Sequence, residues 1–315
     1  MILKNRCGRR LRLSVTALGA ALALLPSSGA AQEAADAQPS SPQTAAPPAG
    51  SVGGLGDINL FPKRLVLEGR REVAVVGLFN KTANEGDYEI AIHDMAMVDG
   101  GQLVPFDNLS DEAGKAEVKT ASAMLRHSPR RVTLRGSESQ TIRLMVRAPA
   151  DLPPGEYRSH FQVVSVPRDV EAGVSIEDAL GENAASGIGV TIRPRFGISI
   201  PVIVRIGETT LDVGIRDASI LTAADGSQAV SFTLTRSGTR SAYGDVIVTA
   251  SGRKEPIALA RGVGLYPELD NRQVVLPLNT ETGAPLSAST ALTISFVDDD
   301  VTPGVVLATH SINSR

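Results

Sequence analysis

The sequence predicts an all-β protein built from two β-sandwich domains in series. Three observations indicate this class. Short alternating runs of apolar and polar residues, rich in Val, Ile and Thr, recur along the chain, and 30 glycines and 19 prolines separate them. No stretch keeps a helical period for long. Because alternate side chains of an extended strand share a face, such runs indicate short strands joined by turns.

The chain of 315 residues begins with the three-part layout of a secretory signal peptide over residues 1–31. A basic start is followed by an apolar run from Leu13 to Leu25 and by the small residues Gly29–Ala31. That run is shorter than the ~20 residues a membrane span needs, so we expect cleavage and no membrane insertion afterwards. The single cysteine, Cys7, lies in this segment, which leaves the mature chain without disulfides.

Residues 32–56 are rich in Ala, Pro, Ser and Gln. They contain too few large apolar side chains to offset the entropy of ordering them. We therefore expect a disordered leader between the signal peptide and the first domain.

The first sandwich domain is predicted over residues 57–205, where strand patterns alternate with turn signals. Residues 107–123 are polar and indicate a loop or a short helix. Residues 148–155 form a connection, because their prolines supply no donor to a sheet, and 168–186 form a long loop. The expected strands span 60–69, 72–80, 88–95, 131–136, 140–147 and 157–166.

The second, smaller sandwich domain is predicted over residues 206–315. Asp225-Gly226 is a hairpin signal between its first two strands. The expected strands span 211–221, 229–235, 244–250, 273–278 and 291–297.

The longest alternating run in the chain covers residues 187–205. Its opposite face carries polar and basic residues, Arg193 and Arg195 among them, and Pro194 interrupts the apolar series. Such a run is either an ordinary core strand or a strand that is lent to another chain, since exposed apolar edges are normally suppressed unless they are used. The apolar positions are Ile188, Val190, Ile192, Phe196, Ile198, Ile200, Val202 and Val204.

No residue pattern for catalysis or for metal binding accompanies these strands. The four histidines have no partner at metal-ligand spacing, and neither a nucleophile elbow nor a phosphate loop occurs. Asp298–Asp300 is expected to be a solvated acidic loop. A net charge of -3, 3% aromatic residues and the absence of tryptophan argue against nucleic acid as a partner. We therefore expect neither an enzyme nor a bound cofactor.

Several local motifs extend this pattern and together resemble the periplasmic pilus-assembly chaperones of the PapD-like family, as a divergent member. The resemblance covers residues 57 to about 300. The motifs are Lys63-Arg64-Leu-Val-Leu-Glu-Gly69, Val75 to Asn80 with an Asn-x-Thr turn, Ser128 to Arg143 with Gly-Ser-Glu-Ser-Gln-Thr-Ile-Arg at its end, Gly155-Glu-Tyr-Arg-Ser-His160, and Arg236 to Asp245.

The resemblance implies two immunoglobulin-like domains in a boomerang arrangement. Such chaperones lend an apolar strand to a pilus subunit that lacks one, and Ile188, Val190 and Ile192 are the side chains that would enter the subunit. Two basic residues of the family hold the subunit's terminal carboxylate. The first corresponds to Arg64. The second is usually a lysine, for which this chain offers Arg195, with Arg193 behind it, and an arginine can bind a carboxylate through two parallel hydrogen bonds.

The expected function is therefore a periplasmic chaperone that caps pilus or fimbrial subunits. The resemblance leaves open an outer-membrane usher as a second partner and a self-capping dimer of the free chain. The alternative is a structural or adhesive envelope module without chaperone activity. In that case residues 188–192 would already be buried in their own domain. Pro194 divides the run under either interpretation, because a proline removes one donor from the sheet.

Overall fold

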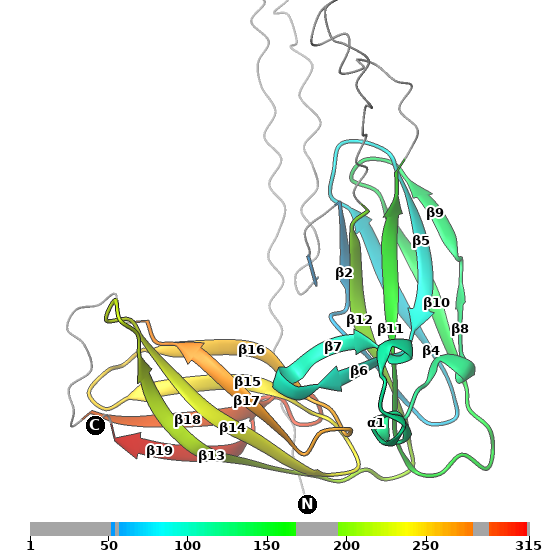
Figure 1. Ribbon diagram of the computed structural model, residues 1–315. Coiled ribbons are helices and arrows are strands. Elements are labelled where there is room, and N and C mark those ends of the chain that lie inside the picture. Colours follow the sequence, from blue (N-terminus) through cyan, green and yellow to red (C-terminus); the bar gives the residue numbers. More distant parts are fainter. Residues whose placement is uncertain (1–51, 54–56, 168–194, 280–289, 314–315) are drawn as a thin grey trace, which may run out of the picture. The chain divides into compact units, whose positions relative to one another are not determined.

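The computed structural model describes residues 52–53, 57–167, 195–279 and 290–313. All of them belong to one compact unit, Thr44–Arg315. The described chain is built almost wholly of β-strands (Figure 1). Its one α-helix, α1 (Glu112–Glu117), has 6 residues, and no helix within the described ranges is long and apolar enough to cross a membrane. The all-β class predicted from the sequence is confirmed.

The first sandwich consists of two 5-stranded sheets that enclose one apolar core. Val76, Ile142 and Leu144 of one sheet and Phe161 and Val202 of the other are fully buried in that core. One sheet has the order β1 (Val52–Gly53), β2 (Ile58–Phe61), β4 (Arg71–Asn80), β10 (Ser139–Arg147), β8 (Leu125–Ser128). The other has the order β3 (Leu65–Glu68), β12 (Gly197–Ile206), β11 (Gly155–Val166), β5 (Gly86–His93), β9 (Arg131–Leu134).

The strand order of this sandwich is that of an immunoglobulin fold. In that fold strands A, B, E and D form one sheet and strands C, F and G the other. Here β2, β4, β10 and β8 take the first set of places, and β5, β11 and β12 take the second. Tyr157, near the start of β11, donates its hydroxyl to the carbonyl of Pro153 at 3.0 Å, which is the tyrosine corner of immunoglobulin-like sandwiches.

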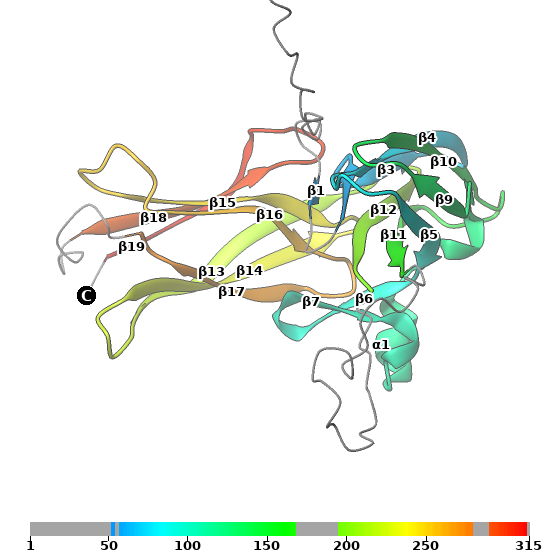
Figure 2. The ribbon, with the colours of Figure 1, turned by 90° about the horizontal axis from the view of Figure 1, so that it is seen from above.

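The second sandwich repeats the A, B, E and the C, F, G parts of this order around its own core of Phe232, Leu234, Val246, Ile294 and Phe296. Figure 2 shows its two layers. One layer has the order β13 (Leu211–Thr222), β14 (Gln228–Gly238), β17 (Asn271–Pro277). The other has the order β16 (Ala258–Leu265), β15 (Ala242–Ala250), β18 (Ala291–Asp298), β19 (Val306–Asn313).

A hairpin of the first sandwich contributes to this second core. It consists of β6 (Met95–Val98) and β7 (Gln102–Pro105), which are joined by the short 3-10 turn Asp99–Gly101. Met97 is buried among residues of the second sandwich, and its backbone N–H donates to Glu268 Oε1 at 2.8 Å.

Two sequence-based expectations need correction, and a third is confirmed. The strand expected over 60–69 is two strands, β2 and β3, in different sheets, because Pro62 and the basic pair after it separate them. Val52–Gly53, placed in the disordered leader, pairs with Leu60 and Asn59 as β1. The loop or short helix expected over 107–123 is confirmed: the short helix α1 lies in it, and the 3-10 turns Phe106–Asn108 and Ser122–Met124 lie at its two ends. The signal peptide, the rest of the leader and the loop 168–186 lie outside the described residues.

Candidate functional site

The strand β12 has a neighbour along only part of one of its edges. It pairs with β11 over its whole length, from Gly197 opposite Val164 to Ile206 opposite Gly155. On the other side it pairs with β3, and there only Val202–Arg205 take part. Within the described residues, Gly197–Pro201 therefore has a strand partner on one side alone. The part of the run from Gly197 to Ile206 therefore belongs to the domain's own sheet.

The open edge exposes backbone hydrogen-bonding groups. The N–H of Ser165 donates to the carbonyl of Phe196 at 2.8 Å. Because bonded and non-bonded pairs alternate in an antiparallel ladder, even-numbered residues of β12 face β11, and Gly197 and Ser199 direct their N–H and C=O groups to the open side. Pro201, which has no N–H, is also suited to an edge. Such an edge can take an added strand.

The core-facing side chains of β12, and of Phe196 just before it, become steadily more exposed toward this open end. Ile200 is 1% exposed, Ile198 is 8% exposed and Phe196 is 41% exposed. The apolar run thus leaves the sandwich core before it reaches the segment predicted to be lent. That segment, with Ile188, Val190 and Ile192, lies outside the described residues, as do Arg193 and Pro194.

Arg195 lies at this open end and pairs with a carboxylate of its own chain. Its Nη2 contacts Glu89 Oε2 at 2.8 Å, and its Nε donates to the carbonyl of Ser165 at 3.2 Å. Arg131 contacts the other oxygen of Glu89. The hydrogen bond from Arg131, followed by that from Arg195, lowers the pKa of Glu89. All three side chains are exposed.

Arg64 lies between β2 and β3 and is also paired already. Its Nη1 is 3.3 Å from Asp299 Oδ2, and its Nη2 donates to the Asp299 carbonyl. Lys63 binds the same carboxylate oxygen. Burial opposes ionisation of Asp299, but the hydrogen bond from Lys63 and the charge of Arg64 outweigh it, so the pKa of Asp299 is lowered. The Arg64 guanidinium also lies 4.9 Å from the centre of the Tyr243 ring.

The structure does not bring Arg64 and Arg195 together. Leu65, next to Arg64, pairs with Val202, and Arg195 precedes Val202 by seven residues. At ~3.3 Å per residue, the two positions are about 20 Å apart along the strand. Arg195 was predicted from the alternation of side chains between the two faces of the strand. That alternation indicates on which face a residue lies, but not how far along the strand it lies.

A buried ionic cluster occupies the opposite end of β12. Arg205 Nε is 3.2 Å from Glu156 Oε2, and Arg205 Nη2 binds Asp300. Arg240 Nη1 is 3.7 Å from Asp300, and Ser241 donates its hydroxyl to Glu156. Burial works against the charge of Arg205, but its two carboxylate partners outweigh burial and raise its pKa. Sequence reasoning missed this cluster.

The acidic loop 298–300 is solvated only at Asp299, contrary to the expectation of a solvated loop. Asp298 is buried. Its Oδ1 accepts the N–H of Asp300 at 3.0 Å, and its Oδ2 accepts the N–H of Thr302 at 2.7 Å. Three consecutive acidic residues directly after a predicted strand were the only sequence signal, and that signal does not reveal the basic residues that pair with Asp299 and Asp300.

A further buried cluster surrounds Arg158, whose Nη2 is 2.5 Å from Glu268 Oε1 and whose guanidinium lies 3.4 Å from the centre of the Tyr266 ring. His160 lies beside it, is buried, and has no hydrogen-bond partner on either ring nitrogen. Within the described residues no group of His, Cys, Asp and Glu could hold a metal ion. His160 is therefore a packed side chain of the strand.

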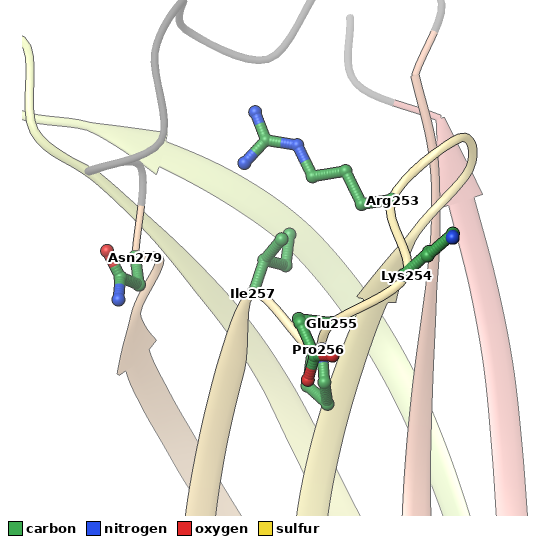
Figure 3. Close-up of a pocket in the computed structure, with 6 residues that line it drawn as sticks. All are labelled: Arg253, Lys254, Glu255, Pro256, Ile257 and Asn279. Carbon is green, nitrogen blue, oxygen red and sulfur yellow. The ribbon is translucent and has the colours of Figure 1, made fainter.

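Two surface cavities are relevant to binding. One of about 430 Å³ is lined by Pro62, Lys63, Arg64, Val66, Glu68, Arg205, Asp299, Asp300 and Val301. The other, of about 380 Å³, is at the loop after β15. Figure 3 shows that its two basic side chains, Arg253 and Lys254, extend in different directions, so they do not converge on a common ligand. The first cavity is the candidate site, because it is lined by Arg64.

Comparisons with known proteins give a likeness in fold. No protein-family model matches the chain, and no curated protein matches it. Among solved structures, it is similar to the YadV chaperone, with 14% identity, a TM-score of 0.40, and 82% of this chain and 100% of that chain covered. The immunoglobulin assignment itself rests on the strand order and register given above.

Two similar structures are complexes. The SafB chaperone, solved with the SafA pilin of Salmonella enterica, has 12% identity and a TM-score of 0.40, with 83% of this chain and 98% of that chain covered. The second is the CsuC–CsuE chaperone–tip adhesion subunit pre-assembly complex from Csu pili of Acinetobacter baumannii. It has 14% identity and a TM-score of 0.40, with 82% of this chain and 97% of that chain covered.

Proposed function

We propose that this chain is a periplasmic chaperone that binds pilus or fimbrial subunits by lending them a strand. One observation carries the proposal. The open edge of β12 at Gly197–Pro201 continues an apolar alternating run that leaves the core of its own sandwich. A partner strand that pairs with this edge would gain main-chain hydrogen bonds, and alternating apolar side chains would supply specificity.

In this proposal Ile188, Val190 and Ile192 fill the groove of a subunit that lacks a strand. The sandwiches correspond to domains 57–205 and 206–315, preceded by a cleaved signal peptide and a leader. Arg64 holds the subunit's terminal carboxylate. Arg195 would contact the bound chain about 20 Å from Arg64, near the other end of the paired strand. Neither a catalytic reaction nor a cofactor is required.

The test is co-purification with a candidate subunit expressed in the same periplasm. Ile192→Asp places a charge in an apolar groove, which costs several kcal/mol, so we expect the complex to be lost. Thr191→Asp, on the opposite face of the same run, is the matched control and should keep the complex. Normal binding by the Ile192 variant would refute strand lending.

The alternative, a structural or adhesive module, is distinguished by amide hydrogen exchange on the free chain. Strong protection of residues 188–192 without any partner would favour the structural module. Protection that develops only when the subunit is added would favour the chaperone. The measurement needs no variant, so it separates a defect in binding from a defect in folding.

A further inference from the structure

Two neighbouring aspartates after β18 are held in different ways. Asp300 is only 4% exposed and is bound by Arg205, with Arg240 3.7 Å away. The turn that presents both residues is closed by Asp298, which accepts the backbone N–H groups of Asp300 and Thr302. Asp299 contributes to neither of these interactions, so the loop keeps its conformation without the Asp299 carboxylate.

The Asp299 carboxylate instead reaches two cations of the first sandwich. One of its oxygens, Oδ2, contacts both Lys63 Nζ and Arg64 Nη1. The side chain of Asp299 is 26% exposed and that of Lys63 is 48% exposed, and both line the cavity of about 430 Å³. Solvent therefore reaches this pair directly, which keeps such an interaction weak.

Arg64 is held by contacts that do not need the Asp299 carboxylate. The Arg64 guanidinium lies 4.9 Å from the centre of the Tyr243 ring, a cation–π contact that orients it. Lys63 and Arg64 directly precede β3, whose pairing with β12 starts at Leu65. Arg64 Nη2 also donates to the Asp299 backbone carbonyl and lies 3.9 Å from Asp300 Oδ1. Arg64 would thus stay in place, facing the cavity, if the Asp299 carboxylate were removed, and Lys63 would keep its place in the chain beside it.

We infer that Lys63 and Arg64 form a carboxylate-binding site that Asp299 of the same chain occupies, and that a partner's carboxylate binds by exchanging with it. The inference rests on the proposed function, because it concerns the same anchor, Arg64. It adds Lys63 as the second cation and Asp299 as an internal competitor. The ligand class is a peptide with a free terminal carboxylate, since the neighbouring open edge of β12 can pair with an extended chain.

An internal competitor lowers the apparent affinity for any external carboxylate. The apparent affinity equals the intrinsic affinity multiplied by the fraction of time that the site is free. Substitution of Asp299 by a residue without a carboxylate should therefore strengthen the binding of an external carboxylate without any new contact to the ligand. The same change should leave binding of an uncharged ligand unaltered. These two consequences separate competition from a general loosening of the loop.

The probe is the peptide Ac-Thr-Val-Thr-Val-Thr-Val with a free carboxylate, compared with its C-terminal amide. Calorimetry on the full chain would measure both peptides with the wild type, Asp299→Asn, Asp299→Ala and Arg64→Ala. Asp217→Asn is the matched control, because it removes an exposed carboxylate paired with Arg216 on β13. We expect Asp299→Asn to bind the acid about threefold to sixfold more tightly, the amide to be unaffected, and Arg64→Ala to lose the preference for the acid.

Each outcome decides one question. Equal affinity of the wild type and both Asp299 variants for the acid, with the acid still preferred to the amide, overturns competition and leaves the anchor intact. No preference for the acid in any variant overturns the carboxylate site itself, while strand lending is judged by the Ile192 test. On the wild type, the carboxyl carbon signal of Asp299 should shift as the acid is added, a readout that depends on no variant; an unchanged signal at saturation would refute exchange.

Discussion

The two ends of β12 bear ion clusters in opposite environments. At the start of the strand, Arg195 and Arg131 share the exposed carboxylate of Glu89. At its end, Arg205 lies between Glu156 and Asp300, whose side chains are 0% and 4% exposed. The strand has an open edge at the first end and is flanked by β3 and β11 at the second.

This difference indicates what each end does. A buried ion pair is costly to break, because either partner would remain charged and unsolvated. An exposed pair is replaced by water with little loss. The end with the buried cluster therefore holds the strand in the protein, whereas the exposed end leaves the strand available to another chain.

The largest effect is expected for Arg205→Ala. It would leave Glu156 and Asp300 buried without their shared counter-ion, and losing one partner of a buried pair typically costs about 3–5 kcal/mol. Urea unfolding followed by circular dichroism would measure the change. Arg205→Lys keeps the charge but not both contacts, so it should lose less. A loss below about 1 kcal/mol for the alanine variant would contradict an anchoring role.

A smaller effect, along the same strand, is expected for truncation of its apolar side chains. Ile200→Ala removes a fully buried side chain from the core and should cost about 2–4 kcal/mol. Phe196→Ala removes more atoms but from a side chain that is 41% exposed, so it should cost clearly less than Ile200→Ala. Equal losses in urea unfolding would show that the open end is covered in solution.

The fold could be predicted largely because the strands alternate. The structure confirms strands at or near the ranges predicted for β4, β10, β11, β15 and β18, where one face packs on a core. β16 was missed because Gly262 and Gly264 interrupt its pattern and give it little strand propensity. β19 was missed because it lies at a sheet edge and its side chains are at most half-buried.

The site could be predicted only in part, since its contacts join distant parts of the chain. Arg64 was identified from a local motif, and the structure places it beside a cavity. Its partner Asp299 is 235 residues away in the sequence, and Arg205 is 49 residues from Glu156. No local pattern indicates which charges will meet across such separations, so the sequence could not distinguish a free anchor from an occupied one.

A pH effect is expected at the middle of β12, where Pro201 lies opposite His160. Burial, and next the charge of Arg158, lower the pKa of His160 from 6.5 to about 3. The unfolded chain therefore binds this proton at a higher pH than the folded chain, and stability is lost as pH falls from about 6.5 toward 3. Between pH 7.5 and pH 5 the loss from this residue should be about 2 kcal/mol.

His160→Leu removes that titration. Both ring nitrogens lack hydrogen-bond partners, so an apolar replacement should cost little at pH 7.5. Urea unfolding at a series of pH values should then show a smaller fall in stability for the variant than for the wild type. Parallel curves for the two proteins would mean that His160 is solvated in solution, and that this part of the strand is less tightly packed than the buried cluster beside it.

The smallest effect is expected for Arg195→Ala, at the open end. Glu89 would keep Arg131 as a partner, and all three groups already face water, so screening by solvent leaves little interaction to lose. Urea unfolding should not distinguish this variant from the wild type. If Arg195 instead meets a bound chain, the same variant should weaken capture of a subunit and leave stability unchanged, which is the reverse of the behaviour expected for Arg205→Ala. A clear loss of stability would show that the two ends of β12 are held alike, and would remove the reason for assigning strand lending to the open one.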